Sequence, residues 1–156
     1  MKTVYLSVGS NLGNRQAHVD QALALIANGV GVIRVVSCSF ESPSWGYESP
    51  NKYINVAVCV ETLLQPMQLL AMTQEIERKI GRKEKTVNGV YHDREIDIDI
   101  LLFEDLILTT EKLTIPHPQM HHRLFVIHPM NEIAPNLQHP LLKQTMATIY
   151  ASLVRF

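Results

Sequence analysis

Long apolar runs, cysteine pairs and excess charge are all missing from this 156-residue sequence, and each absence excludes a class of protein. No apolar run approaches the ~20 residues of a membrane helix, and Met-Lys-Thr, which leads directly into the strand-like TVYLSV, is too short for a signal peptide. There is no CxxC pair, and we expect Cys38 and Cys59 to be reduced core thiols. These absences favour a cytoplasmic protein.

Charge is nearly balanced, with 14 basic and 15 acidic residues and a formal net charge of −1. This balance does not point to a nucleic-acid or membrane partner. The composition, 46% apolar and 19% charged, is ordinary for a globular protein. Because no repeat, low-complexity tract or linker divides the chain, we expect residues 1–156 to form a single domain with a substantial core.

Hydrophobic periodicity predicts the order strand, helix, strand, strand, helix, strand. The expected ranges are strands at 3–8, 32–40, 53–61 and 96–103, helices at 15–28 and 66–80, and a further helix at 141–153. This βαββαβ order is typical of a ferredoxin-like α+β sandwich, in which helices cover one face of a largely antiparallel sheet.

The stretch HDREIDIDILLFED, residues 92–105, places two acidic side chains inside an apolar run. Alternate side chains share a face of a strand, so Asp97 and Asp99 point the same way, roughly 6–7 Å apart. Two solvated carboxylates at a sheet edge fit poorly with the apolar residues on both sides. A divalent metal would relieve the repulsion, and oxygen-only ligands with room for water and phosphate favour Mg²⁺. The DxD pattern alone is weak, since many phosphoryl- and glycosyl-transfer enzymes share it.

Several cations lie just before the aspartates, in and around the polar loop RKEKTVNGVYHD: Arg82, Lys83, Lys85 and Arg94. A basic loop of this kind is usually only solvated. Beside a metal-binding carboxylate pair, however, such cations suit a polyphosphate ligand, because they can neutralise its developing charge.

The histidines of PHPQMHHR admit two interpretations. A zinc site at His117, His121 and His122 is disfavoured, because Pro118 disturbs the local helix and no cysteine lies nearby. Hydrogen bonding to phosphate by His117 and Arg123 is the preferred interpretation.

Three aromatic residues gather in or next to a loop rich in proline, serine and glycine. Trp45, Tyr47 and Tyr53 lie within nine residues of each other and precede Asn55 on a predicted strand. They could form a slot for a flat heterocycle. The earlier segment GSNLGN resembles a phosphate-binding loop but lacks the GxxxxGK[ST] spacing, so a tight strand-to-helix turn is the better interpretation.

Six motifs, taken in this order, resemble the 6-hydroxymethyl-7,8-dihydropterin pyrophosphokinase family of folate biosynthesis. They are GSNLG, SPSWG, YxN at Tyr53–Asn55, ExxxGR at Glu77–Arg82, DRxIDIDIL at 93–101 and PHPxMxxRxFVxxPxxEIAP at 116–135. The resemblance covers essentially the whole chain and implies a ferredoxin-like α+β fold. It also implies a reaction that passes pyrophosphate from ATP to the hydroxymethyl oxygen of the pterin and leaves AMP.

The resemblance implies a role for each matching position. Asp97 and Asp99 would bind two Mg²⁺ ions, and Arg82 and Arg94 would act in catalysis from a loop that closes over the site. The ATP-side positions are Gln74, Glu77, Arg82, Arg94, Ile100, His117 and Arg123. The pterin-side positions are Ser42, Pro43, Trp45, Tyr53, Asn55, Asp97 and Phe125. Among these, Tyr53 and Phe125 would stack on the ring and Asn55 would read its amide edge.

The sequence departs from the family pattern at three places. Tyr91-His92-Asp93 replaces a Trp-Gly-Pro or similar triplet before the arginine, Ser42 replaces a threonine, and Pro118 replaces a tyrosine. Two rival functions remain at this point. One is a different Mg²⁺-dependent enzyme, such as a phosphoesterase, and the other is a non-catalytic ferredoxin-like module that binds a small ligand or RNA.

Overall fold

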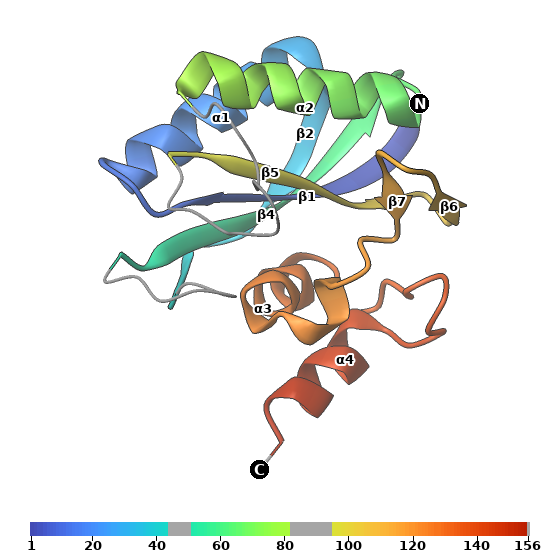
Figure 1. The fold of residues 1–156 in the computed structure, drawn as a ribbon. Coiled ribbons are helices and arrows are strands. Elements are labelled where there is room, and N and C mark those ends of the chain that lie inside the picture. The colour runs from blue at the N-terminus through green and yellow to red at the C-terminus, as the bar shows by residue number, and fades with distance from the viewer. Residues whose placement is uncertain (44–50, 82–94, 156) are drawn as a thin grey trace.

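The computed structural model describes residues 1–43, 51–81 and 95–155. Within these residues, one antiparallel sheet has the order β2-β4-β1-β5, and β3 also pairs with β4 (Figure 1). The strands are β1 (Lys2–Ser10), β2 (Gly31–Val36), β3 (Phe40–Ser42), β4 (Tyr53–Thr62) and β5 (Asp97–Phe103). The first helix connects β1 to β2 and the second connects β4 to β5, so the predicted ferredoxin-like order is confirmed.

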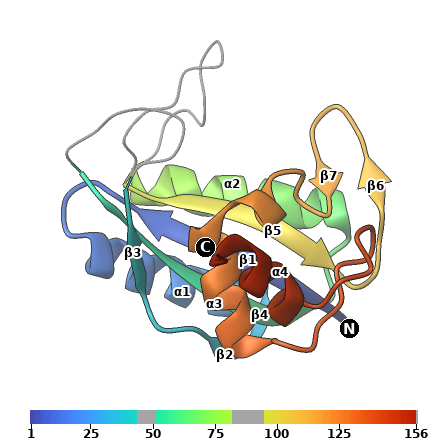
Figure 2. The same ribbon diagram turned by 90° about the horizontal axis from the view of Figure 1, so that it is seen from below.

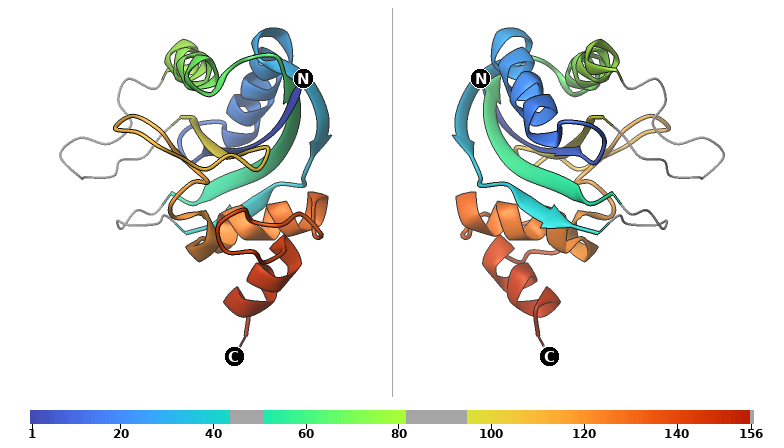
Figure 3. Two further views of the ribbon diagram at one scale, coloured as in Figure 1. Left: turned by 90° about the vertical axis from the view of Figure 1, so that its right-hand side faces the viewer. Right: turned by 90° about the vertical axis from the view of Figure 1, so that its left-hand side faces the viewer.

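Helices cover both faces of the sheet, whereas the sequence predicted helices on one face. Figure 1 shows α1 (Arg15–Gly29) and α2 (Pro66–Ile80) above the sheet, with α3 (Leu124–Ile133) and α4 (Met146–Leu153) below it. Helices α3 and α4 lie in front of the sheet when the molecule is seen from below (Figure 2). Helix α3 packs on β3 and β4, and α4 packs on α3 (Figure 3).

Local signals account for the ends of two of the three predicted helices, α1 and α2. Asn14 caps α1 by accepting a hydrogen bond from the backbone N–H of Ala17 at 3.1 Å. Pro66 occupies the first turn of α2, and Gly81 ends that helix with a φ of 132°. Helix α3 was not predicted, because Pro129 within it conceals the helical pattern and removes one backbone donor.

Each face of the sheet has its own apolar core. Val4, Leu6 and Val8 of β1 belong to the core under α1 and α2, while Leu101 and Leu102 belong to the core under α3 and α4. A bulge in β5 explains why these two consecutive leucines share a face. Tyr5 pairs with Leu102 and Leu6 with Ile100, so Leu101 is an extra residue in the strand. The apolar run that follows the aspartates therefore serves both cores.

The remaining elements complete the chain. A small hairpin is formed by β6 (Leu108–Thr109) and β7 (Thr114–Ile115), and a 3₁₀ turn spans Met120–His122. Cys59 is buried and Cys38 is exposed, so the prediction of two core thiols was wrong for Cys38, where the chain passes between β2 and β3. No helix in the described ranges is long and apolar enough to cross a membrane.

Candidate active site

The sheet register places the two aspartates beside the central strand. Gly9 of β1 pairs with Asn55 on one side and with Asp97 on the other, and Ser7 pairs with Ala57 and Asp99 in the same way. Because Leu101, two residues beyond Asp99, lies in the core under α3, both aspartates face that side of the sheet. Both are half-buried. The predicted sharing of one face is confirmed.

Arg123 supplies a positive charge next to this pair. It lies immediately before α3, is buried, and has its Nη1 4.0 Å from Oδ2 of Asp99. Its guanidinium carbon also lies 5.6 Å from the centre of the Phe125 ring. The start of α3 therefore brings a cation and an aromatic ring to the face that carries the aspartates.

Glu77 holds the outer edge of β5. Its side chain is only 5% exposed, and its Oε2 accepts a hydrogen bond of 2.8 Å from the backbone N–H of Ile98. This N–H points away from β1, on the side of β5 that faces α2. Because Ile98 lies between Asp97 and Asp99 in the chain, the bond fixes the backbone from which both carboxylates project.

A cavity of about 280 Å³ opens beside this edge of β5. Its lining includes Gln74 and Glu77 from α2, Asp99 and Ile100 from β5, and His117. Four residues predicted on the ATP side thus surround one cavity that also touches a predicted metal ligand. Asp99 and Ile100 lie on opposite faces of β5, so the cavity extends around the edge of the strand.

His117 is held in one orientation. Its backbone N–H donates to the carbonyl of Leu101 at 2.9 Å, which ties the segment before α3 to β5. Its Nδ1 accepts from the backbone N–H of Gln119 at 3.1 Å. In the neutral ring the proton is therefore on Nε2, which makes this nitrogen a donor suited to a phosphate oxygen.

The predicted pterin side lies across β1 from the aspartates. Asn55 is 4% exposed, and its Nδ2 has no hydrogen-bond partner within the described residues. The buried Oγ of Ser42 likewise has no partner there. Ser42 pairs with Tyr53 in the ladder between β3 and β4, while Pro43 is exposed. Two buried polar atoms at this end of the sheet thus have no partner among the described residues, and a polar ligand could satisfy both.

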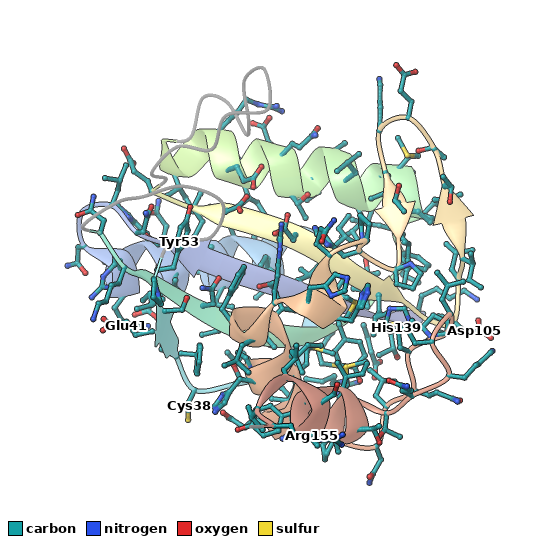
Figure 4. All side chains as sticks on the ribbon, turned by 60° about the horizontal axis from the view of Figure 1, so that its bottom comes forward. Cys38, Glu41, Tyr53, Asp105, His139 and Arg155 are labelled. Carbon is teal, nitrogen blue, oxygen red and sulfur yellow. The ribbon has the colours of Figure 1, made fainter. Side chains whose placement is uncertain are left out.

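Figure 4 shows that Tyr53 and Glu41 lie at the opposite end of the sheet from Asp105 and His139. Near that second end is a larger cavity, of about 710 Å³, whose lining includes Tyr5, Glu104 and Lys143. Burial raises the pKa of Tyr5 to about 12, so its hydroxyl remains protonated. Among the predicted site residues that the structure describes, none lines this cavity.

Six residues singled out in the sequence lie outside the described residues: Trp45, Tyr47, Arg82, Lys83, Lys85 and Arg94. The zinc interpretation finds no support, since the described ranges contain no group of three or more His, Cys, Asp or Glu side chains able to hold a metal. The rings of His121 and His122 instead contact each other in a tilted arrangement, with centroids 3.9 Å apart and an interplanar angle of 44°.

Sequence reasoning missed two contributions to the site. One is Gly9, which lies within β1 between Asn55 and Asp97 rather than in the turn that follows. A glycine in a strand interior signals close approach of another group, and this signal was available in GSNLG. The other is the segment Glu111–Thr114, which lines the 280 Å³ cavity and carries no pattern that would have singled it out.

Comparison with known proteins agrees with this geometry. Residues 5–135 match the model of the family described as 7,8-dihydro-6-hydroxymethylpterin-pyrophosphokinase (HPPK). The chain is 45% identical over 141 residues to 2-amino-4-hydroxy-6-hydroxymethyldihydropteridine pyrophosphokinase of Porphyromonas gingivalis, covering 90% of this chain and 95% of that protein. It is 36% identical to the enzyme of the same name from Aquifex aeolicus, covering 94% of this chain and 89% of that protein.

A solved structure supports the fold independently. The structure of Plasmodium falciparum HPPK-DHPS with pteroate superposes with a TM-score of 0.80 at 17% identity. The match covers 98% of this chain but only 44% of the longer Plasmodium chain. Together with the identity to curated enzymes, these matches show that the chain belongs to the 7,8-dihydro-6-hydroxymethylpterin-pyrophosphokinase family, whose members carry out the pyrophosphokinase step of folate biosynthesis.

Proposed function

We propose that this chain transfers pyrophosphate from ATP to the hydroxymethyl group of 6-hydroxymethyl-7,8-dihydropterin, with the two substrates on opposite sides of Asp97 and Asp99. The observation that carries the proposal is the position of these carboxylates. They lie between the carboxamide of Asn55, whose Nδ2 has no partner among the described residues, and the cavity lined by Gln74 and His117. A single cytoplasmic domain spanning residues 1–156 would be sufficient for this reaction.

On the ATP side, the cavity beside β5 would hold the nucleotide. Gln74 is exposed on α2 and can hydrogen-bond polar groups of the ligand, while Ile100 offers an apolar wall. The protonated Nε2 of His117 and the guanidinium of Arg123 are donors for phosphate oxygens. Arg82 and Arg94 would add charge that stabilises the transition state as AMP departs.

Asp97 and Asp99 fit a Mg²⁺ site. Magnesium in phosphoryl-transfer enzymes is held by one or two carboxylates and completes its coordination with water and substrate phosphates. A half-buried pair next to a cavity, with no third acidic or histidine ligand in the described residues, matches this donor set. When bound, the metal supplies charge neutralisation at the phosphate oxygens. The carboxylates orient the polyphosphate toward the pterin side.

On the pterin side, Asn55 would pair its amide with the donor and acceptor edge of the heterocycle. Cα atoms of Asn55 and Asp97 are separated by two strand spacings, roughly 10 Å across β1. A bicyclic ring lying over Gly9 could therefore meet Asn55 at one edge and present its hydroxymethyl group near Asp97. Tyr53 and Phe125, from β4 and α3, are the aromatic residues available for stacking.

The test is the identity of the products. Purified protein is incubated with ATP, with and without Mg²⁺ and with and without hydroxymethyldihydropterin, and the nucleotides are separated by chromatography. We expect AMP only when all components are present, in equal amount to a pyrophosphorylated pterin. Release of free phosphate, or AMP that does not depend on the pterin, would contradict the proposal and favour a phosphoesterase.

A further inference from the structure

Gly9 occupies the central position of the row formed by Asn55, Gly9 and Asp97. Its φ lies outside the left-handed region, so the backbone itself does not demand a glycine. Space does. A Cβ added at Gly9 would lie 3.1 Å from Cγ of Asn55, closer still to Oδ1 of Asn55, and 3.4 Å from the carbonyl oxygen of Ile54.

The close approach concerns the functional end of the Asn55 side chain. The carboxamide lies across β1 directly over Gly9, and its Nδ2 has no hydrogen-bond partner among the described residues. No hydrogen bond from Nδ2 to another described residue fixes the carboxamide. Its position then depends on the room that the missing side chain of Gly9 leaves.

We infer that Gly9 is a positioning residue for recognition of the pterin. By lacking a side chain, it lets the carboxamide of Asn55 lie across the central strand and meet the hydrogen-bonding edge of the heterocycle. This inference rests on the proposed role of Asn55, and it adds the reason why that residue is held in a competent orientation.

Gly9→Ala tests the inference without unfolding the protein. The closest contact of the new methyl group is with the far end of a side chain, which can rotate away, so we expect the melting temperature to change little. We expect the dissociation constant of hydroxymethyldihydropterin, measured by calorimetry with Mg²⁺ and a non-hydrolysable ATP analogue, to rise at least about 10-fold. Affinity for the ATP analogue alone should change less than about twofold, whereas a general structural defect would weaken the binding of both ligands.

A double-mutant cycle separates positioning from simple obstruction. In an Asn55→Ala background the clash is removed, so adding Gly9→Ala should weaken pterin binding less than about twofold further. A loss of about 10-fold in both backgrounds would mean that the methyl group blocks the ligand directly, and would overturn the inference. Near-normal pterin binding by Gly9→Ala would overturn it as well.

Two further variants complete the design. If Asn55→Ala binds the pterin normally, the proposed pterin side fails, which is distinguishable from a failure at Gly9 alone. The matched control is Gly29→Ala at the end of α1, where a Cβ would lie 3.3 Å from Sδ of the flexible Met72. This variant should leave both ligand affinities unchanged.

Discussion

Replacing Glu77 by alanine tests how the edge strand β5 is held in place. The carboxylate of Glu77 is 5% exposed and accepts the backbone N–H of Ile98 at 2.8 Å. A hydrogen bond to a charged group contributes about 1.5–3 kcal/mol, and a buried donor left without a partner costs about 1–3 kcal/mol. The cavity of about 280 Å³ touches both residues, so water can enter the variant and replace part of the lost bond.

We therefore expect Glu77→Ala to lower the free energy of unfolding by about 2 kcal/mol. For a chain of this size that corresponds to a fall in melting temperature of roughly 4–8 °C. Glu77→Gln keeps an acceptor for the N–H and should lose only about 1 kcal/mol. Because Ile98 separates Asp97 from Asp99, the alanine variant should also lose turnover beyond what its folded fraction explains.

The assay is urea unfolding followed by circular dichroism, with AMP formation measured on the same samples. The control is Glu75→Ala on the exposed face of α2, where the ion pair with Arg78 is solvent-exposed and adds little stability. If Glu77→Ala and Glu75→Ala have equal stability, the bond to Ile98 does not hold β5. If stability falls but turnover per folded molecule is normal, the bond does not position the aspartates.

Three further predictions concern the two aspartates, the two arginines of the polar loop and His139. Asp97→Ala and Asp99→Ala should each abolish AMP formation and leave a folded protein by circular dichroism; near-normal turnover in either would contradict the metal assignment. Arg82→Ala and Arg94→Ala should each lower kcat by about 10²-fold, equivalent to roughly 2.7 kcal/mol. The affinity for ATP measured in the absence of the pterin should change little. If the ATP affinity falls by the same factor as kcat, the two arginines bind ATP in the ground state, and the prediction is wrong. Burial and neighbouring charge lower the pKa of His139 below its ordinary value of 6.5. The free energy of unfolding should therefore fall as the pH drops below about 6.5, and urea unfolding at about pH 7.5 and 5.5 measures this change.

The direction of the pH effect follows from proton linkage. His139 is 2% exposed, and its Nδ1 accepts the backbone N–H groups of Leu141 and Leu142 at 3.2 Å each. The folded protein therefore disfavours the charged ring, while the unfolded chain takes up a proton near pH 6.5. His139→Asn keeps an acceptor without titrating, so its stability should change less between the two pH values. An equal loss in both proteins would assign the effect elsewhere.

Features of this protein that depend on local periodicity could be predicted from the sequence. Strand and helix order could be read from spacings of 2 and 3.6 residues, because burial of one face imposes these periods on neighbouring positions. The same rule put Asp97 and Asp99 on one face of β5, as observed. Helix α3 escaped this reasoning, because Pro129 interrupts the pattern that would have revealed it.

Which distant residues meet could not be predicted in this way, because it depends on the three-dimensional arrangement of the strands and helices. Asn55, Gly9 and Asp97 come from three strands, and their alignment follows from a register that a shift of one residue would destroy. Arg123 reaches Asp99, and Glu77 reaches Ile98, because helices from different parts of the chain pack on opposite faces of the same sheet. Such contacts depend on how whole layers pack together, and no local pattern along the chain encodes them.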